Sequence, residues 1–197
     1  MAGDKVKDPS RESYYISDEF YEALVGAYTG WDSDDVESHD PGLRETCRMF
    51  LEKEARYLDQ GRLDDWLGLF APECAYWIPA TSDGGDPRTE ITIAFDDRRQ
   101  LESRVYRLNT GHAWSQQPVS RTSRMVSNVT VFETADLDIS MVRSNFTIAE
   151  IRAGETRQWA GWCGHRLHWI GDRWEILVKQ VNLIDCDQNL RNPSLIL

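Results

Sequence analysis

The order of patterns along the chain predicts an α+β fold, with helices in the first half and a mostly antiparallel sheet in the second. Apolar residues recur at helical spacing in four segments before residue 110, and a period of two replaces that spacing after residue 119. Short connections join the last four segments, which indicates an antiparallel meander. We expect the helices to cover one face of that sheet.

The first helix is expected to begin at Ser17, because serine is a good N-cap and acidic residues follow it in the first turn. Phe20, Leu24 and Tyr28 form its apolar stripe. An acidic loop with turn-forming residues follows at positions 30–42.

A second helix is predicted from about Leu43 to Gln60, where Gly61 is well placed to end it. Helical spacing resumes at Leu63 and continues to Phe70, before Ala71-Pro72 stops the run. One broad apolar face marks the long helix, formed by Cys47, Phe50, Leu51, Ala55 and Leu58.

An aromatic strand is predicted at Cys74–Pro79, followed by a loop at 81–90 and an extended piece at 91–95. The next helix can be capped by Asp96 or Asp97 and ends near Asn109-Thr110-Gly111. Its apolar stripe consists of Leu101, Val105 and Leu108.

Strict alternation assigns the strand residues after position 119 to two faces. In the first strand we expect Val126, Asn128, Thr130 and Phe132 on one face, and Met125, Ser127, Val129 and Val131 on the other. Single faces of the later strands are expected to carry Val142, Phe146 and Ile148; then Trp159, Cys163, Leu167 and Trp169; then Trp174, Ile176, Val178 and Ile184.

Length and charge narrow the classes of function. The 197 residues fit one α+β domain at 17–197, preceded by a disordered or extended arm at 1–16. The net charge is −11, and the first 40 residues hold three basic against eleven acidic side chains. This balance argues against nucleic acid or an anionic membrane as a partner. No apolar run is long enough to span a bilayer and no signal peptide is recognisable, so we expect a cytoplasmic protein.

The cysteines and histidines do not form a recognisable metal motif. Cys47, Cys74, Cys163 and Cys186 contain no CxxC pair and are expected to be free thiols. Cys163-Gly164-His165 matches half of a Rieske cluster motif, but Asn189 stands where the second half needs a histidine. His165 and His168 should point to opposite faces of a strand, which opposes a shared iron site.

Six arginines lie close together along the fourth predicted helix and the strand after it, which suggests a subunit interface. Arginine is favoured at interfaces because its planar guanidinium pairs with carboxylates through two hydrogen bonds. The alternative is a solvated face with local ion pairs such as Arg98 with Glu102. The candidate interface residues are Arg98, Arg99, Arg104, Arg107, Arg121 and Arg124, with Trp77 and Trp114 as anchors.

Several segments together resemble one family. They are YWIPA from Tyr76, DDRRQLESRVYRLNTGHAW from Asp96, SRTSRMVSNV from Ser120 and NLIDCDQNLRNPSLIL from Asn182. In order and spacing, residues 43–197 resemble the small (β) subunit of Rieske-type aromatic-ring-hydroxylating dioxygenases. The long acidic stretch of the first 40 residues departs from that pattern.

The resemblance implies a cone-shaped, nuclear-transport-factor-2-like fold, in which a strongly curved sheet wraps around helices. It also implies a non-catalytic subunit of an α3β3 hexamer, with three copies of this chain supporting three α subunits. No cofactor is expected in this chain. The Rieske [2Fe-2S] cluster and a mononuclear Fe(II) are expected in the α subunit, which receives electrons from NAD(P)H through reductase and ferredoxin components.

Two other functions stay open at this stage. The same cone fold is used by dehydratases and isomerases, which place Asp, His and Tyr inside the cone, so Tyr57, Asp65, His112 and His165 are candidates for acid–base catalysis. Such an enzyme would act alone on a small hydrophobic substrate. A non-catalytic module that binds small molecules is the third possibility.

Overall fold

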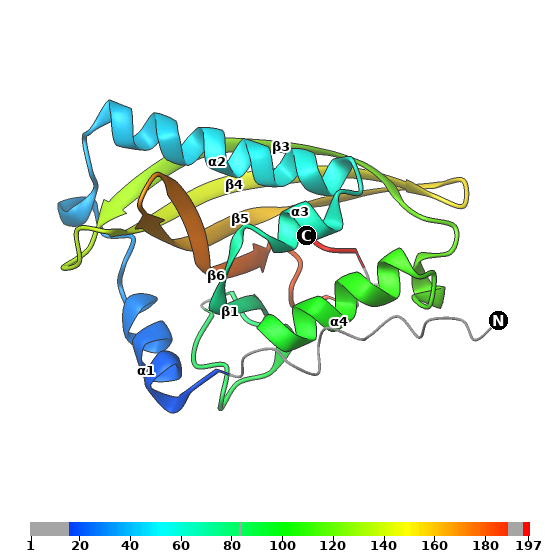
Figure 1. Cartoon of the computed structure of the whole chain (residues 1–197), viewed down its shortest axis with the longest axis horizontal. Helices are drawn as coiled ribbons and strands as arrows, with labels where there is room; N and C mark the ends of the chain where they lie inside the picture. The colour runs from blue at the N-terminus through cyan, green and yellow to red at the C-terminus, as the bar shows by residue number, and fades with distance from the viewer. Residues whose placement is uncertain (1–15, 83, 189–194) are drawn as a thin grey trace.

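The computed structural model describes residues 16–82, 84–188 and 195–197, and its helices and strands form an α+β fold (Figure 1). The predicted arm at 1–16 lies outside the described residues except for Ile16. In chain order the elements are α1 (Asp18–Ala27), η2 (Asp34–Val36), α2 (Pro41–Asp59), α3 (Leu63–Leu67), β1 (Phe70–Pro79), β2 (Thr92–Asp97), α4 (Arg98–Asn109), η3 (Trp114–Gln116), β3 (Arg121–Glu133), β4 (Ile139–Arg152), β5 (Glu155–Ile170) and β6 (Arg173–Leu183).

The helix starts follow the capping residues in the sequence. Ser17 caps α1, and its side chain accepts a hydrogen bond from the backbone N–H of Phe20. Asp97 caps α4, where it forms a reciprocal capping box with Gln100. The long helix begins at Pro41, two residues before the predicted start, because Asp40 accepts hydrogen bonds from the first free backbone N–H groups.

The boundary between α3 and β1 lies earlier than predicted. Helical spacing suggested a helix through Phe70, but α3 ends at Leu67 and β1 already begins at Phe70. Backbone pairing with β6 explains the difference, since the N–H of Ile176 donates to the carbonyl oxygen of Leu69 at 2.8 Å. Partners far away in sequence therefore decide where this helix stops.

The sheet contains the predicted antiparallel meander and one connection that local patterns do not indicate. Its strand order is β2-β1-β6-β5-β4-β3, and the neighbours among β3, β4, β5 and β6 are antiparallel. The strand β1 pairs antiparallel with β2 but parallel with β6. The first strand of the chain, β1, therefore lies directly beside the last one, β6, within the sheet.

A bulge in β3 overturns the strict alternation predicted there. The register with β4 shifts between Ser127 and Thr130, and Asn128 has a φ of 51°. Because of this extra residue, the side chains that follow it lie on the face opposite to the one that strict alternation predicts. Val126 and Val131, which were predicted on opposite faces, therefore contact the same core cluster.

A second bulge changes the facing of β6. Ile176 and Val178 pair with consecutive residues of β5, so Leu177 is an extra residue. Ile176 faces the main core, whereas Val178 packs on the other side of the sheet. Ile184 lies beyond the end of β6 and is exposed. The prediction that Val178 and Ile184 share the face of Trp174 and Ile176 is wrong.

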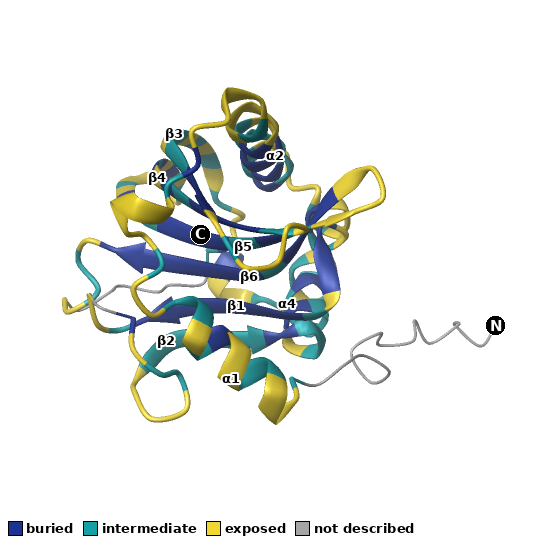
Figure 2. Cartoon of the chain, turned by 90° about the vertical axis from the view of Figure 1, so that its left-hand side faces the viewer, coloured by how far each residue is buried: buried dark blue, intermediate teal, exposed yellow. Residues whose placement is uncertain are grey.

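Helices lie on both faces of the sheet, which corrects the expectation of a single covered face. Figure 2 shows α2 on one side and α1 on the other, with the buried side of α2 turned toward the sheet. Cys47, Leu51 and Leu58 of α2 belong to the main cluster inside the curved sheet. Leu24 of α1 packs instead against Trp77 and other residues of a second, smaller cluster. Within the described parts of the chain, no helix combines the length and apolar character needed to cross a bilayer.

Candidate functional site

A cluster of charged side chains lies fully buried between α2 and the sheet. Glu54 of α2 accepts a hydrogen bond from Nζ of Lys179 at 2.7 Å and one from Nε1 of Trp66 at 3.1 Å. Its other carboxylate oxygen lies 3.2 Å from Nε2 of His165. Both carboxylate oxygens are therefore bound by side chains of the same chain.

The surroundings of the cluster fix its charge states. Burial acts to raise the pKa of Glu54, but the Lys179 ammonium and the His165 hydrogen bond outweigh it, so this pKa is lowered and the carboxyl is ionised. Burial lowers the pKa of His165, which keeps its imidazole neutral. Nearby, burial raises the pKa of the Cys163 thiol to about 12, so this thiol stays protonated at neutral pH.

We expect the chain to lose stability below about pH 6.5 because of His165. The unfolded chain binds a proton on this residue near its ordinary pKa of 6.5, whereas the folded chain binds it only at lower pH. In that window the unfolded state holds more protons, so the free energy of unfolding falls as the pH falls. Urea unfolding at about pH 7.5 and about pH 5.5 measures this loss. The His165→Gln variant should lose less stability over the same interval, and an equal loss in both proteins would contradict the assignment.

The four candidates for acid–base catalysis are not brought together. His165 is the member inside the cone, whereas the side chains of Asp65 and His112 are exposed and bound to Arg62 and Thr110 respectively. Tyr57 lies half-buried beneath the guanidinium of Arg62, which is 4.2 Å from its ring centroid. The chain therefore lacks the convergence that an active site built from these four residues would require.

The residues also do not fit an iron–sulfur cluster. Cys163 and His165 both face the core, but His165 is engaged by Glu54, and Asn189 stands where the second half of the motif needs a histidine. His165 and His168 are three residues apart on the continuous strand β5, so their side chains point to opposite faces. Across residues 16–82, 84–188 and 195–197, no three His, Cys, Asp or Glu side chains gather as metal ligands.

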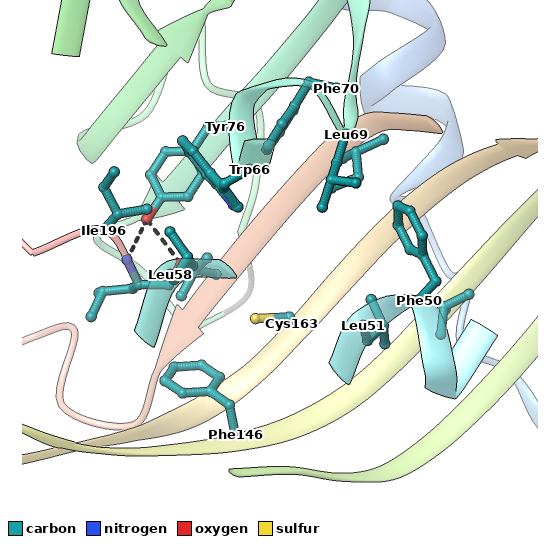
Figure 3. Packing of buried hydrophobic residues seen from close by; sticks show 14 of the residues in the cluster. Phe50, Leu51, Leu58, Trp66, Leu69, Phe70, Tyr76, Phe146, Cys163 and Ile196 are labelled. Carbon is teal, nitrogen blue, oxygen red and sulfur yellow. Dashed lines mark hydrogen bonds between the residues drawn. The ribbon is translucent and has the colours of Figure 1, made fainter. Parts of the chain in front are cut away.

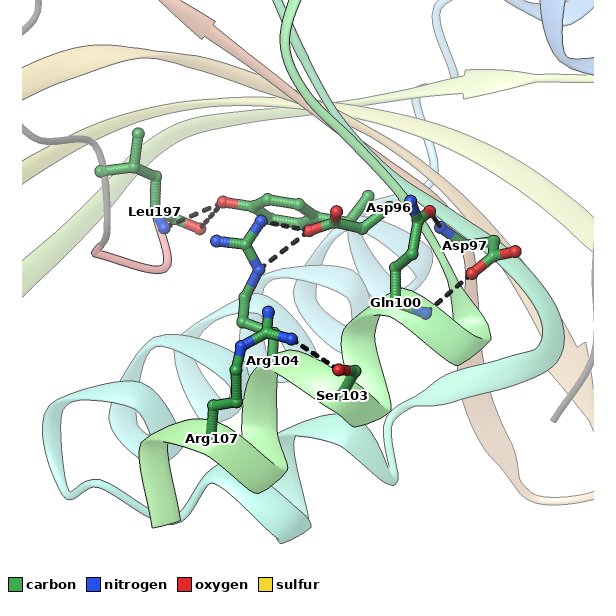
Figure 4. A network of polar contacts seen from close by, with 8 residues as sticks. Asp96, Asp97, Gln100, Ser103, Arg104, Arg107 and Leu197 are labelled. Atoms are coloured by element: carbon green, nitrogen blue, oxygen red, sulfur yellow. Dashed lines mark hydrogen bonds and ion pairs between the residues drawn. The ribbon is translucent and has the colours of Figure 1, made fainter. Parts of the chain in front are cut away.

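Several arginines of the candidate interface are held by neighbours within the chain. Arg98 donates to Glu102 and to the carbonyl oxygens of Leu67 and Phe70, so it ties α4 to the end of α3. Figure 4 shows Arg104 of α4 bonded to Asp96 of β2, and Arg107 bonded to Ser103 within α4. Arg99 is half-buried, whereas Arg107 and Arg121 are exposed. The alternative of local ion pairs is thus realised for Arg98 and Arg104.

Arg124 was expected on the surface, and that prediction is wrong because only 6% of its side chain is exposed. Its guanidinium forms an ion pair with Asp59 at 2.6 Å, and the same nitrogen contacts Thr122 at 2.7 Å. Its other terminal nitrogen donates to the carbonyl oxygen of Ile196. Arg124 therefore joins α2, β3 and the C-terminal segment Leu195–Leu197 inside one chain.

The two candidate tryptophan anchors differ completely in exposure. Trp77 is fully buried beneath α1, with edge-to-face contacts to Tyr28 and Phe95, so its predicted position on the surface is wrong. Trp114 in η3 is 82% exposed, close in sequence to the exposed Val119. Trp114 and Val119 thus present apolar side chains that an interaction surface would cover.

Sequence reasoning missed Glu54 and Lys179, although a signal for the first was present. Glu54 stands in the apolar stripe of α2 between Leu51 and Leu58, where a solvated carboxylate would not be expected. Lys179 lies within the continuously buried part of β6. Each of these two apolar patterns contains one charged residue. This was the available indication that the two side chains form a buried ion pair between α2 and β6.

Comparison with known proteins decides the family. A family model described as the ring hydroxylating beta subunit matches residues 53–188, which is more than half of the chain. The chain belongs to the ring-hydroxylating β-subunit family. The benzoate 1,2-dioxygenase subunit beta of Acinetobacter baylyi is 35% identical to this β-subunit chain over 144 residues, covering 71% of this chain and 85% of the relative.

Solved structures agree with the family and its fold. The crystal structure of the β subunit of benzoate 1,2-dioxygenase from Burkholderia mallei matches with a TM-score of 0.63 and 28% identity, covering 76% of this β-subunit chain and 95% of the other. An NTF2-like protein with a cystatin-like fold from Novosphingobium aromaticivorans matches with a TM-score of 0.52 and 12% identity, over 72% and 82% of the two chains. The predicted cone-shaped, NTF2-like α+β fold is confirmed.

Proposed function

We propose that this chain is the non-catalytic β subunit of an α3β3 aromatic-ring dioxygenase. Three copies would pack together and support three α subunits. The α subunit would carry the Rieske cluster and the mononuclear iron, and would add both atoms of O2 to an aromatic ring. Electrons would come from NAD(P)H through reductase and ferredoxin components, in the cytoplasm. The observation that carries the proposal is the family match over residues 53–188.

The non-catalytic role is supported by the interior of the cone. The carboxylate of Glu54 is held by Lys179, His165 and Trp66, and the other candidate acid–base residues lie elsewhere. Within the described residues, no Cys and His side chains gather as the ligands of a Rieske cluster. Chemistry performed by a partner accounts for both facts.

An aromatic carboxylate is the substrate class that we propose for the complex. The support comes from two similar proteins, both of which are named as β subunits of benzoate 1,2-dioxygenases. Oxygen consumption with benzoate and with naphthalene would separate an acid substrate from a neutral polycyclic one.

Co-expression with an α subunit of an aromatic-ring dioxygenase tests the assembly. We expect the two chains to purify together with the native mass of an α3β3 hexamer, and the isolated β-subunit chain to bind no iron. Native mass spectrometry and iron analysis measure both quantities. One iron held tightly by each isolated chain, or failure of the two chains to associate, would overturn the proposal.

The exposed surface around Trp114 is the part of the predicted interface that we expect to contact another subunit. Trp114→Ala should weaken assembly by about 2 kcal/mol or more, as is common for a tryptophan buried on binding. Leu137→Ala is the matched control, because Leu137 is 98% exposed and follows the opposite end of β3. Dissociation of the complex on dilution measures both effects. Equal affinities for the Trp114→Ala complex and the unmodified complex would remove Trp114 from the interface.

A further inference from the structure

The C-terminal segment Leu195–Leu197 fills part of the cone interior. Ile196 and Leu197 are both buried, and they belong to the same apolar cluster as Leu58 and Phe146 (Figure 3). The segment is in neither a helix nor a strand. Displacing the segment would therefore break no backbone hydrogen bonds of a helix or a sheet.

Two polar side chains of the interior bind the backbone of this segment. The hydroxyl of Tyr76 accepts a hydrogen bond from the N–H of Leu197 at 3.0 Å and donates one to the backbone oxygen of the same residue at 3.4 Å (Figures 3 and 4). Arg124 donates to the carbonyl oxygen of Ile196. The wall of the cone thus offers donors to a carbonyl group, surrounded by apolar side chains.

Space exists on both sides of the segment. A cavity of about 30 Å³ lies on its inner side, lined by Leu197 and by the polar cluster of Glu54, His165 and Lys179. In this cluster Nδ1 of His165 is buried and has no hydrogen-bond partner among the described residues. A groove of about 450 Å³ lies on the outer side, and Leu195 and Ile196 form part of its wall. Arg124 lines both spaces, and the segment lies between them. It therefore separates the inner cavity from the outer groove.

We propose that the cone interior is a binding site for small apolar molecules that carry a carbonyl group, and that Leu195–Leu197 occupies this site as an internal ligand. A bound molecule would replace Ile196 and Leu197 against Leu58 and Phe146. Its carbonyl oxygen would accept the hydrogen bonds that Tyr76 and Arg124 now give to the segment.

A shortened chain tests the proposal with two probes of similar shape, acetophenone and ethylbenzene, of which only the first has a carbonyl. The β-subunit chain is measured alone, because an α subunit would contribute its own aromatic pocket. A chain that stops after residue 194 should bind acetophenone at least about tenfold more tightly than the full chain, by isothermal titration calorimetry. It should also prefer acetophenone to ethylbenzene by about three- to tenfold, as one hydrogen bond allows. No binding by the folded, shortened chain, or equal binding of the two probes, would overturn the proposal.

Two tyrosine variants test whether the hydroxyl of Tyr76 causes the preference for acetophenone. Tyr76→Phe in the shortened chain should abolish the preference for acetophenone, because the hydroxyl donor is removed. Tyr21→Phe is the matched control, since Tyr21 stacks on Phe95 outside the cone. It should leave the preference unchanged. A preference that survives Tyr76→Phe, or one that Tyr21→Phe also abolishes, would count against the assignment.

The full chain provides a second measurement that does not depend on the shortened chain folding. Saturating acetophenone should accelerate hydrogen exchange at the N–H of Leu197, which Tyr76 now protects. Exchange at Val181, which lies within β6, should stay unchanged. Undiminished protection of Leu197 at saturating acetophenone would show that the segment does not leave, and would overturn the proposal.

Discussion

Glu54→Gln is expected to lower the free energy of unfolding by about 3–5 kcal/mol, toward the lower end because the amide oxygen can still accept a hydrogen bond. The substitution keeps the shape of the side chain but leaves the Lys179 ammonium buried without an opposite charge. An unpaired charge in an apolar interior is far more costly than a lost contact on the surface. Urea unfolding at neutral pH measures the change.

Two variants separate the buried charge from other effects at Glu54. Glu54→Gln combined with Lys179→Met removes both charges, and it should regain most of the lost stability because no ammonium is left unpaired. Glu45→Gln lies on the same helix, in an exposed ion pair with Arg48, and should leave the unfolding midpoint unchanged. If the double variant is no more stable than Glu54→Gln, the unpaired ammonium is not the cause.

Gly161→Ala is expected to destabilise the chain by about 3 kcal/mol through a backbone collision. A Cβ at this position of β5 would lie 2.0 Å from the carbonyl oxygen of Asn182 and 3.1 Å from the Cα of Leu183. Both atoms belong to the backbone of β6, so neither can rotate away as a flexible side chain would. The two strands must separate locally, and the pairing of Gly161 with Leu183 is weakened. Urea unfolding of this variant beside the unmodified chain measures the loss.

Gly26→Ala is the matched control for this prediction. Gly26 lies in α1, and a Cβ there would meet nothing within 4 Å. The same change should therefore stabilise the chain slightly, by about 0.5–1 kcal/mol, because alanine favours a helix over glycine. A Gly161→Ala variant that is as stable as the unmodified chain would mean that a small shift has relieved the collision at β5.

The features predicted correctly are those that depend on near neighbours in sequence. Ser17 and Asp97 cap helices, and the short turns between β3 and β6 produce a meander, because capping and hairpin formation involve residues a few positions apart. The parallel pair of β1 and β6 could not be predicted in this way, because about a hundred residues separate the partners. The bulges at Asn128 and Leu177 were missed because the alternation rule assumes that no strand contains an extra residue.

The exposure of the candidate interface residues also depends on partners that are distant in sequence. A cluster of arginines in the sequence suggests exposure, but the partner of Arg124 is Asp59, which lies 65 positions away. Trp77 belongs to a strand that is buried on both faces, and only the position of α1 makes this evident. Trp114, in a short loop element, keeps the exposure that sequence reasoning expected.

The parallel pairing of β1 with β6 also sets an order for folding during synthesis. β1 ends at Pro79, whereas β6 is complete only at Leu183. At a translation rate of about 5–20 residues per second, β1 leaves the ribosome roughly 5–20 s before its partner is finished. In that interval Tyr76 and Trp77, which are buried on opposite faces in the finished chain, have no sheet to cover them. The nascent chain, rather than the folded one, is therefore the form most prone to aggregate.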